Sequence, residues 1–329
     1  MNSLLRGATV AVALMFCAAA LAGIAGLDAA ATVTWVPLHP ASAPGPRMAF
    51  GMAYDPVSQR IVLFGGFDGT RYLDDTWIFD GTDWSRVTTA SAPPPRSGLA
   101  MAYDKTSRRL VMFGGFDGAG YLGDTWTWDG ANGTWTEMSP TRSPPAETGP
   151  VMFTDPANGR AVVFGGYDGM FYQLETWRWN GSDWVKLHPA HTPSARSATI
   201  AAHDRRFDNV VVFGGLAQVN PYNTWSWDGV DWTLESPATQ PPNRYSSAAA
   251  YEPHLGAVVL FGGGAGGTDL DDSWKWTGTD WVQMQPINSP AARESYGLVY
   301  DPMIDRVILF GGLRRNTLLN DTWKLGFQR

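Results

Sequence analysis

The hydrophobic positions of the chain fall in short segments separated by polar turns, and one stretch shows the pattern clearly. Residues Gly98 to Tyr103 and Leu110 to Phe113 are apolar and flank a polar turn from Asp104 to Arg108. After a loop, residues Asp124 to Trp128 and Thr134 to Met138 place tryptophans among polar residues. Short runs of this kind, bounded by turn residues, predict four β-strands, and we find no helical periodicity beyond the N-terminal segment.

The same pattern occurs six times along the chain. Each copy has a glycine pair at the end of its second strand, and successive pairs are 48 to 51 residues apart: Gly65-Gly66, Gly114-Gly115, Gly165-Gly166, Gly214-Gly215, Gly262-Gly263 and Gly311-Gly312. A period near 50 fits four short strands with their turns and is too long for most helical repeats. In five copies an Asp-Gly, Asn-Gly or Thr-Gly step predicts a tight hairpin between the third and fourth strands.

The tryptophans keep register with this repeat. Of the sixteen, six open the third strand, four stand two residues later, and six lie in the fourth strand. A sugar-stacking surface is one interpretation of so many aromatic residues. Because every tryptophan occupies a repeated position, packing between neighbouring sheets is the favoured interpretation.

A glycine pair, a tyrosine about six residues later and a tryptophan about five beyond that, at this period, resemble the kelch repeat. The resemblance covers residues 32–329 and implies an all-β fold, a six-bladed kelch-type β-propeller with one four-stranded blade per repeat. Trp-Asp pairs at Trp128-Asp129 and Trp227-Asp228 also suggest WD-repeat propellers. The WD repeat is nearer forty residues long, so the kelch resemblance is preferred.

The two ends of the repeated region complement each other. After Trp323 the sixth copy ends without a fourth strand, whereas residues Thr34 to Leu38 look like a fourth strand that precedes any first strand. We therefore expect the N-terminal strand to complete the last blade, which would leave no unpaired blade edge.

The first 31 residues differ in kind from the rest. Arg6 precedes an almost wholly apolar run that ends in Ala29, Ala30 and Ala31, which predicts a signal peptide over residues 1–31 and an extracellular or periplasmic location. The run is also long enough for an uncleaved membrane anchor. The single cysteine, Cys17, lies in this segment, so cleavage would leave no disulfide, thiolate metal site or cysteine nucleophile.

Composition and charge restrict the partners. The formal net charge of -7 argues against a nucleic acid or an anionic membrane surface, and a membrane contact is expected only if residues 1–31 remain attached. With 44% apolar and 17% charged residues the chain can bury a substantial core, and we expect a monomer.

The candidate ligand face follows from the predicted strand order. If strands run outward from the axis, the returns between blades and the loops after the glycine pairs share one face. The returns carry an arginine in register in five copies, with a glutamate in the third: Arg47, Arg96, Glu147, Arg196, Arg244 and Arg293. The loops add Tyr72, Tyr121 and Tyr172, besides Asp68, Asp117 and Asp168.

Two interpretations of the arginines remain open. Five guanidinium groups around an opening could hold a carboxylate, sulfate or phosphate by bidentate hydrogen bonds. Alternatively, each arginine pairs with a loop carboxylate and ties blade to blade, and this is favoured because a feature repeated in every blade serves what every blade needs. Departures from the repeat are then better clues to a ligand: Glu147 and residues 217–223, 264–269 and 314–316.

No cofactor or metal is expected. The sequence GGFDG lacks the Lys-Ser/Thr step and the helix that a nucleotide loop needs. Asp68, Asp74 and Asp75 offer oxygen atoms to calcium, but their spacing matches no calcium loop, and copies four and six lack the first aspartate. The five histidines do not form a convincing catalytic or metal-binding cluster.

Three functions agree with these observations. The first is an exported, non-catalytic binding protein that holds a protein or an acidic glycan on the loop face. The second, implied by the resemblance, is a carbohydrate-active kelch enzyme of the sialic acid mutarotase kind, in which the arginines would suit an anionic sugar and Glu147 could move a proton. Copper oxidase chemistry of the galactose oxidase type is rejected because it needs a cysteine crosslinked to a tyrosine, and the chain has no cysteine once residues 1–31 are removed. The third function is a structural component of the cell envelope.

Overall fold

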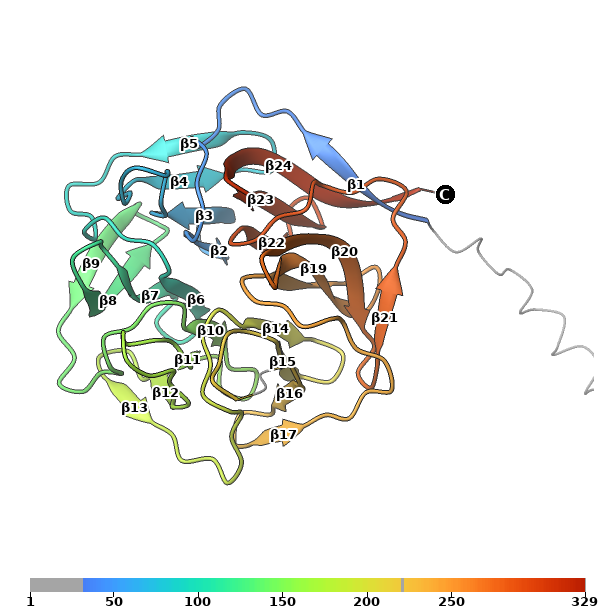
Figure 1. Ribbon diagram of the computed structural model, residues 1–329. Coiled ribbons are helices and arrows are strands. Elements are labelled where there is room, and N and C mark those ends of the chain that lie inside the picture. Colours follow the sequence, from blue (N-terminus) through green and yellow to red (C-terminus); the bar gives the residue numbers. More distant parts are fainter. Residues whose placement is uncertain (1–31, 220–221, 329) are drawn as a thin grey trace, which may run out of the picture.

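The described chain is built from strands alone. The computed structural model describes residues 32–219 and 222–328, so the predicted signal segment lies outside the described residues. Within these residues the secondary structure consists of 24 strands, and no helix is long and apolar enough to cross a membrane. The strands form six sheets of four antiparallel strands each, arranged in a ring (Figure 1).

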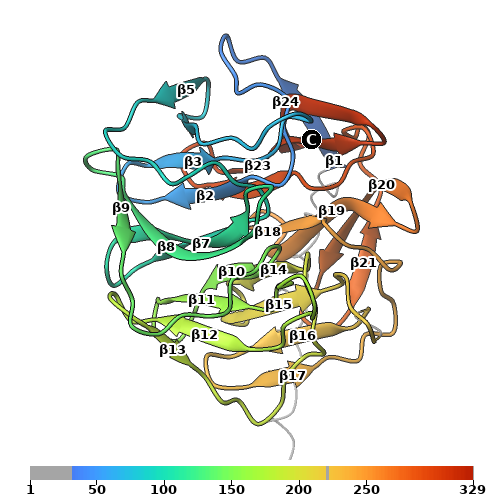
Figure 2. The same cartoon turned by 60° about the vertical axis from the view of Figure 1, so that its left-hand side comes forward.

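The first three blades follow the sequence order from the axis to the rim. Blade 1 contains β2 (Gly51–Asp55), β3 (Arg60–Phe64), β4 (Thr76–Phe79) and β5 (Trp84–Val87). Blade 2 contains β6 (Ala100–Asp104), β7 (Arg109–Phe116), β8 (Tyr121–Asp129) and β9 (Thr134–Met138). Blade 3 contains β10 (Val151–Thr154), β11 (Ala161–Phe164), β12 (Thr176–Trp179) and β13 (Trp184–Lys186). Figure 2 shows blade 2 between blades 1 and 3.

The last three blades repeat this order. Blade 4 contains β14 (Ile200–Asp204), β15 (Asn209–Phe213), β16 (Thr224–Trp227) and β17 (Trp232–Leu234). Blade 5 contains β18 (Ala248–Glu252), β19 (Ala257–Ala265), β20 (Thr268–Trp276) and β21 (Trp281–Met284). Blade 6 contains β22 (Gly297–Asp301), β23 (Arg306–Arg314), β24 (Thr317–Gln328) and, as its outer strand, β1 (Thr32–Leu38).

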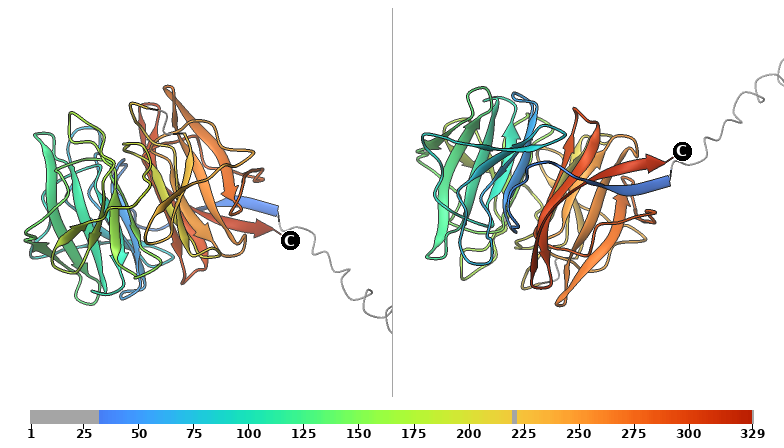
Figure 3. Two further views of the ribbon diagram at one scale, coloured as in Figure 1. Left: turned by 90° about the horizontal axis from the view of Figure 1, so that it is seen from below. Right: turned by 90° about the horizontal axis from the view of Figure 1, so that it is seen from above.

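The N-terminal strand closes the ring, as the sequence predicts. Strand β1 pairs antiparallel with β24 from Thr32 opposite Gln328 to Leu38 opposite Thr322. Both panels of Figure 3 show this strand beside the C-terminal end of β24 at the rim. The six-bladed propeller with its last blade completed by the N-terminal strand is therefore confirmed.

Burial explains why the second strand of each blade is continuously apolar. Residues Ile61 to Phe64 of β3 are fully buried, because neighbouring blades cover both faces of the sheet. In the outer strand β5 only Trp84 is buried, while Ser85 and Arg86 are exposed. The core accordingly consists of six clusters, each of which joins two neighbouring blades.

Fourth-strand tryptophans join the blades by hydrogen bonds as well as by packing. The indole nitrogen of Trp135 in blade 2 donates to the hydroxyl of Thr76 in blade 1 at 2.9 Å. The equivalent bond recurs around the ring at 2.8 to 3.3 Å: Trp184 to Thr125, Trp232 to Thr176, Trp281 to Thr224, Trp35 to Ser273 and Trp84 to Thr322. The packing interpretation of these tryptophans therefore holds, and the hydroxyl partners are an addition that the structure makes.

The glycine pairs are contacts between blades. The amide of Gly66 donates to the carbonyl oxygen of Arg96 in the next blade at 2.8 Å. A Cβ atom on Gly65 would lie 2.7 Å from that carbonyl oxygen, and both glycines have positive φ angles. Equivalent amide bonds run around the ring, so the repeated glycines allow close approach of neighbouring backbones.

A closed ring of backbone hydrogen bonds surrounds the axis. The residue two positions after each in-register arginine or glutamate donates its amide to the same position of a neighbouring blade, at 2.7 to 2.9 Å. The six members have φ between +50° and +65°: Ala49, Gly98, Gly149, Ala198, Ser246 and Ser295. Left-handed backbone is unfavourable for alanine and serine, and the hydrogen bonds of the ring hold these residues in it.

Three loops form more regular structure than the sequence predicts. In blade 2 the residues after the glycine pair continue as a hairpin, with Gly115 opposite Leu122 and Phe116 opposite Tyr121. Strands β7 and β8 are therefore longer than predicted, and a register shift between Phe113 and Gly115 interrupts their pairing. Blades 5 and 6 have the same extended hairpin. The glycine pair permits this irregularity, whereas apolar periodicity does not reveal it.

Candidate functional site

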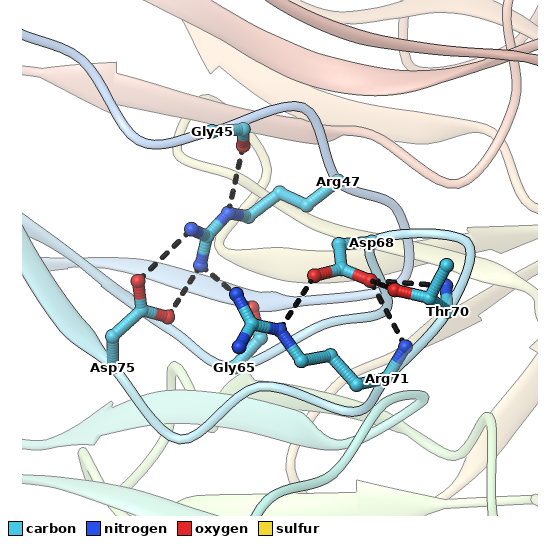
Figure 4. A network of polar contacts seen from close by, with 7 residues as sticks. All are labelled: Gly45, Arg47, Gly65, Asp68, Thr70, Arg71 and Asp75. Atoms are coloured by element: carbon cyan, nitrogen blue, oxygen red, sulfur yellow. Dashed lines mark hydrogen bonds and ion pairs between the residues drawn. The ribbon is translucent and has the colours of Figure 1, made fainter.

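Four of the five in-register arginines form ion pairs within their own blades, with the arginine side chain buried. Figure 4 shows the guanidinium group of Arg47 against the carboxylate of Asp75, with bonds of 2.6 and 2.9 Å. The same guanidinium donates to the carbonyl oxygen of Gly65 at 3.1 Å, which places the returns and the glycine-pair loops on one face. We call this the loop face. Arg96, Arg244 and Arg293 pair in the same way with Asp124, Asp272 and Asp321.

These pairs leave little guanidinium surface for a ligand. The arginine side chains in the four pairs are at most 4% exposed. Each carboxylate also accepts a hydrogen bond from the tryptophan two residues later, as Asp75 does from Trp77. Arg196 is buried too and donates to Asn223 and Ser194. The geometry agrees with the structural interpretation, but the side-chain pair lies within one blade. The link between blades is made by the backbone carbonyl oxygen of the arginine, which accepts the amide of a glycine in the neighbouring blade. The ligand-binding role of the arginines stays a prediction.

Glu147 breaks the pattern in blade 3. It is 2% exposed, and its Oε2 atom has no hydrogen-bond partner within the described part of the chain. Burial raises the pKa of Glu147 to about 9, and the negative charges of Glu175 and Asp168 add to the effect. Glu175, which stands where other blades have the aspartate partner, pairs instead with Lys186. Glu147 is thus a neutral, buried carboxylic acid near pH 7.

The three candidate tyrosines belong to an arc of aromatic rings on the loop face. The arc runs Phe67, Tyr72, Phe116, Tyr121, Tyr167 and Tyr172, with ring centroids 5.0 to 5.9 Å apart. Tyr72 and Tyr121 each lie against a glycine of the next blade, Gly118 and Gly169. Tyr172 is the last ring of the arc.

A cavity of about 550 Å³ occupies the loop-face mouth of the central channel. All six residues of the backbone hydrogen-bonded ring line it. Hydroxyl-bearing residues from several blades add polar groups, and Tyr167, Tyr172, Leu99 and Leu216 add apolar surface. No charged residue is among the described residues that line it. Of the predicted site residues, Tyr172 is the one that the structure brings to this cavity.

Beside the cavity lies a group of exposed apolar side chains, which we call the apolar patch: Met170, Phe171, Leu216 and Val219, between 38% and 71% exposed. A smaller cavity of about 140 Å³ lies between Phe171, Tyr172 and Val219. Tyr172 therefore forms a wall common to both cavities. The patch comes from the glycine-pair loops of blades 3 and 4.

The apolar patch departs from the repeat. At the position of Met170, blades 1 and 2 have Thr70 and Ala119. At the position of Phe171, blades 1 and 2 have Arg71 and Gly120. The scaffold thus does not need apolar side chains here. Loop residues 217–223 were singled out from the sequence as a departure, but Met170 and Phe171 were missed, although aligning the six loops would have shown them.

The loop aspartates serve the turns that contain them. Asp68 accepts hydrogen bonds from the amides of Thr70 and Arg71, and Asp117 and Asp168 bind the equivalent amides. These bonds lower the pKa values of Asp117 and Asp168. Among the described residues, no group of three or more histidine, cysteine, aspartate or glutamate side chains is arranged to hold a metal ion.

Comparisons with known proteins agree with this architecture. The family described as the KLHDC2/KLHL20/DRC7 Kelch-repeats domain matches residues 27–215. The chain belongs to the kelch-repeat family. A search of curated proteins gave no match. Among solved structures, the one titled "Structure of YjhT" is similar with a TM-score of 0.69 and 14% sequence identity, covering 88% of this chain and 99% of that chain. At this identity the likeness establishes the fold alone.

Proposed function

We propose that this kelch protein is a non-catalytic binding module that holds an extended peptide segment of a partner protein on the loop face of blades 3 and 4. The observation that carries the proposal is the apolar patch next to two cavities that share Tyr172. Exposed apolar groups at positions that are polar or small in blades 1 and 2 are typical of interaction surfaces. Loops on a rigid scaffold are suited to this role.

The chemistry of the surface favours a peptide over a glycan. Three of the four side chains of the patch, Met170, Leu216 and Val219, provide apolar contact without the flat face on which a sugar ring stacks. The larger cavity combines serine and threonine hydroxyls with tyrosine rings, which can accept an apolar side chain and bond a peptide backbone. An acidic glycan would need exposed cations; the paired in-register arginines of this face are buried, whereas Arg71 is exposed. An acidic glycan therefore remains a competing ligand for the test.

The test selects ligands without assuming a partner. The purified chain is immobilised and exposed to a displayed library of random peptides, and enriched peptides are synthesised and measured by calorimetry. We expect enriched peptides to carry at least two apolar residues, because two cavities flank Tyr172. The same measurement with sialic acid and neutral sugars tests the glycan.

Two variants locate the binding. Phe171→Arg introduces the residue of blade 1 and should weaken peptide binding about tenfold or more, equivalent to about 1.4 kcal/mol. Phe207→Arg is the matched control, because Phe207 is also exposed but lies in the turn after β14, at the opposite end of the inner strand. Equal losses in both variants, or tight binding of an acidic sugar in place of peptides, would overturn the proposal. No enrichment at all would favour an envelope structural component.

The enzymatic alternative rests on Glu147. A neutral buried carboxyl can donate a proton, but Glu147 is not among the residues that line the larger cavity. Anomer exchange of sialic acid, followed by NMR with wild type and Glu147→Gln, tests this alternative. A rate enhancement that Glu147→Gln abolishes would support mutarotation, and equal rates would remove Glu147 from the reaction.

We place the binding activity outside the cytoplasm, because residues 1–31 have the composition of a signal peptide. Cell fractionation and N-terminal sequencing of the isolated protein check this placement. An N-terminus near residue 32 in the exported fraction is the expected result, and an intact N-terminus in the membrane fraction would indicate an anchor.

A further inference from the structure

A second cavity opens on the opposite face of the propeller, which we call the turn face. It has a volume of about 480 Å³ and lies where the inner strands end. Its rim is formed by the residue that precedes the closing acid of each inner strand: Tyr54, Tyr103, Thr154, His203, Tyr251 and Tyr300. Below the rim, the lining is dominated by alanine, methionine and leucine side chains. The cavity thus has an apolar interior and a rim rich in hydroxyl groups.

Two cations at this mouth depart from the repeat. The residue after the closing acid is proline in four blades, namely Pro56, Pro156, Pro253 and Pro302. In blades 2 and 4 this position holds Lys105 and Arg205, which are exposed and line the cavity. Thr154 and His203 likewise replace the rim tyrosine in blades 3 and 4. A scaffold requirement shared by all blades does not account for cations at only two equivalent positions.

The charges of both cations act on one rim group, His203. Burial lowers the pKa of His203, and the positive charges of Lys105 and Arg205 lower it further, against the opposing effect of Asp208. The guanidinium carbon of Arg205 lies 5.8 Å from the ring centroid of Tyr251 and 5.2 Å from that of Tyr300. Arg205, although exposed, therefore lies over the aromatic rim in cation–π contacts.

These cations have no carboxylate partner. Within residues 32–219 and 222–328, neither Lys105 nor Arg205 belongs to an ion pair, and the lining of the cavity contains no aspartate or glutamate. The four buried arginines of the loop face are paired, so their charge is not available to a ligand.

We propose that the turn-face cavity binds a small organic carboxylate with an apolar body. The carboxylate lies at the rim, where Lys105 and Arg205 line the cavity without an ion-pair partner among the described residues. The apolar body enters the interior formed by residues such as Ala102, Ala202 and Leu298. This site is separate from the peptide surface and does not depend on it.

The test compares benzoate with benzamide, which has nearly the same shape and no charge. Binding to the full chain is measured by calorimetry and by saturation-transfer NMR. We expect benzoate to bind with a dissociation constant in the millimolar range or below, about tenfold or more tighter than benzamide, and to weaken as salt is added. Equal binding of the two compounds, or no binding of benzoate, would overturn the proposal.

Charge removal at the mouth locates the site. The double variant Lys105→Gln/Arg205→Gln should reduce benzoate affinity about tenfold, while its melting temperature stays at the wild-type value because both side chains are exposed. Arg71→Gln is the control, since Arg71 is an exposed cation of the loop face. Phe171→Arg should leave benzoate binding unchanged. Unchanged affinity in the double variant, or an equal loss in Arg71→Gln, would contradict the assignment.

Discussion

At the scale of single residues, the same arginine can build a scaffold or bind a ligand, and its neighbours decide which. Arg96 is fully buried, and its two terminal nitrogen atoms bond Asp124 at 2.6 and 2.7 Å. A ligand would have to break this pair and open the surrounding return. On the loop face, side chains that are at least partly exposed next to a cavity are instead Phe171, Tyr172 and Val219.

The scaffold role of Arg96 predicts a stability effect. Arg96→Gln leaves the partly buried Asp124 carboxylate without its charged partner, and we expect the free energy of unfolding to fall by about 2 to 4 kcal/mol. Denaturant unfolding measures this change, with Arg71→Gln as an exposed control that stays near wild type. Wild-type stability of Arg96→Gln would show that the pair is dispensable and would revive the ligand-binding interpretation.

Glu147 predicts a dependence of stability on pH. Its pKa is raised from 4.5 to about 9, so between these values the folded state binds a proton that the unfolded state lacks. Stability from this group is therefore present below pH 4.5 and is lost as the pH rises toward 9, by at most about 1.4 kcal/mol per pH unit. Unfolding at pH 5 to 9 should show a steeper loss in wild type than in Glu147→Gln. Parallel curves would contradict the neutral state of Glu147.

At this scale, the sequence predicts a residue's role well only where the residue recurs in several blades. The recurrence of the arginines can be seen in the sequence. Their side-chain partners lie 27 or 28 residues away across a loop and are identified only by the structure. Met170 and Phe171 carry no motif, and their exposure follows from the way the loop of blade 3 lies on the blade. The candidate site was sought among charged residues and tyrosines, so these two apolar residues were not considered.

At the scale of elements, neighbouring blades are joined by a small set of repeated contacts. The tryptophan–hydroxyl bonds connect the outer strand of one blade to the third strand of another. The amides of the second glycines and the ring around the axis make further connections nearer the centre. Because these contacts use backbone atoms and one hydroxyl per blade, loop side chains are free to vary.

The tryptophan–hydroxyl bond predicts the effect of one conservative change. Thr76→Val keeps the shape of the side chain and removes the acceptor of the Trp135 indole, leaving a buried N–H group unpaired. We expect a loss of about 1 to 3 kcal/mol in the free energy of unfolding. Thr88→Val, at an exposed position after β5, is the control. A loss in Thr76→Val no larger than in the control would show that the bond does not stabilise the blade contact.

The elements themselves could be predicted because their periodicity and turn residues agree in six copies. The hairpin extensions of β7 and β8 could not, because the register shift at the glycine pair disrupts the alternation on which strand prediction depends. The hydrogen-bonded ring was also missed. Its only signal is a glycine, alanine or serine at one position, and small residues of this kind are common in turns and loops of every sort.

At the scale of the whole molecule, closure of the ring places both cavities on one axis. The six inner strands line the channel, and its two mouths are the loop-face and turn-face cavities. The ring is complete because β1 supplies the seven residues that pair with β24. The complementary ends of the repeated region predict this closure from the sequence, whereas the residues that line the two mouths could be assigned only from the structure.

Closure predicts a large effect of a small truncation. A chain that begins at residue 41 lacks β1, exposes the edge of β24 and removes the fully buried Trp35. We expect its melting temperature to fall by about 10 °C or more, with a larger hydrodynamic radius, relative to a chain that begins at residue 32. Calorimetry and size-exclusion chromatography check this. Equal melting temperatures would show that β1 does not stabilise the closed ring.

The central claim is that repeated residues build the scaffold and that departures from the repeat in blades 3 and 4 build the peptide surface. Hydrogen exchange of the full chain with and without a selected peptide tests it most directly. The account predicts added protection confined to the glycine-pair loops around residues 167–174 and 214–219. Protection confined to blades 1, 2, 5 and 6, or to the turn face, would contradict it.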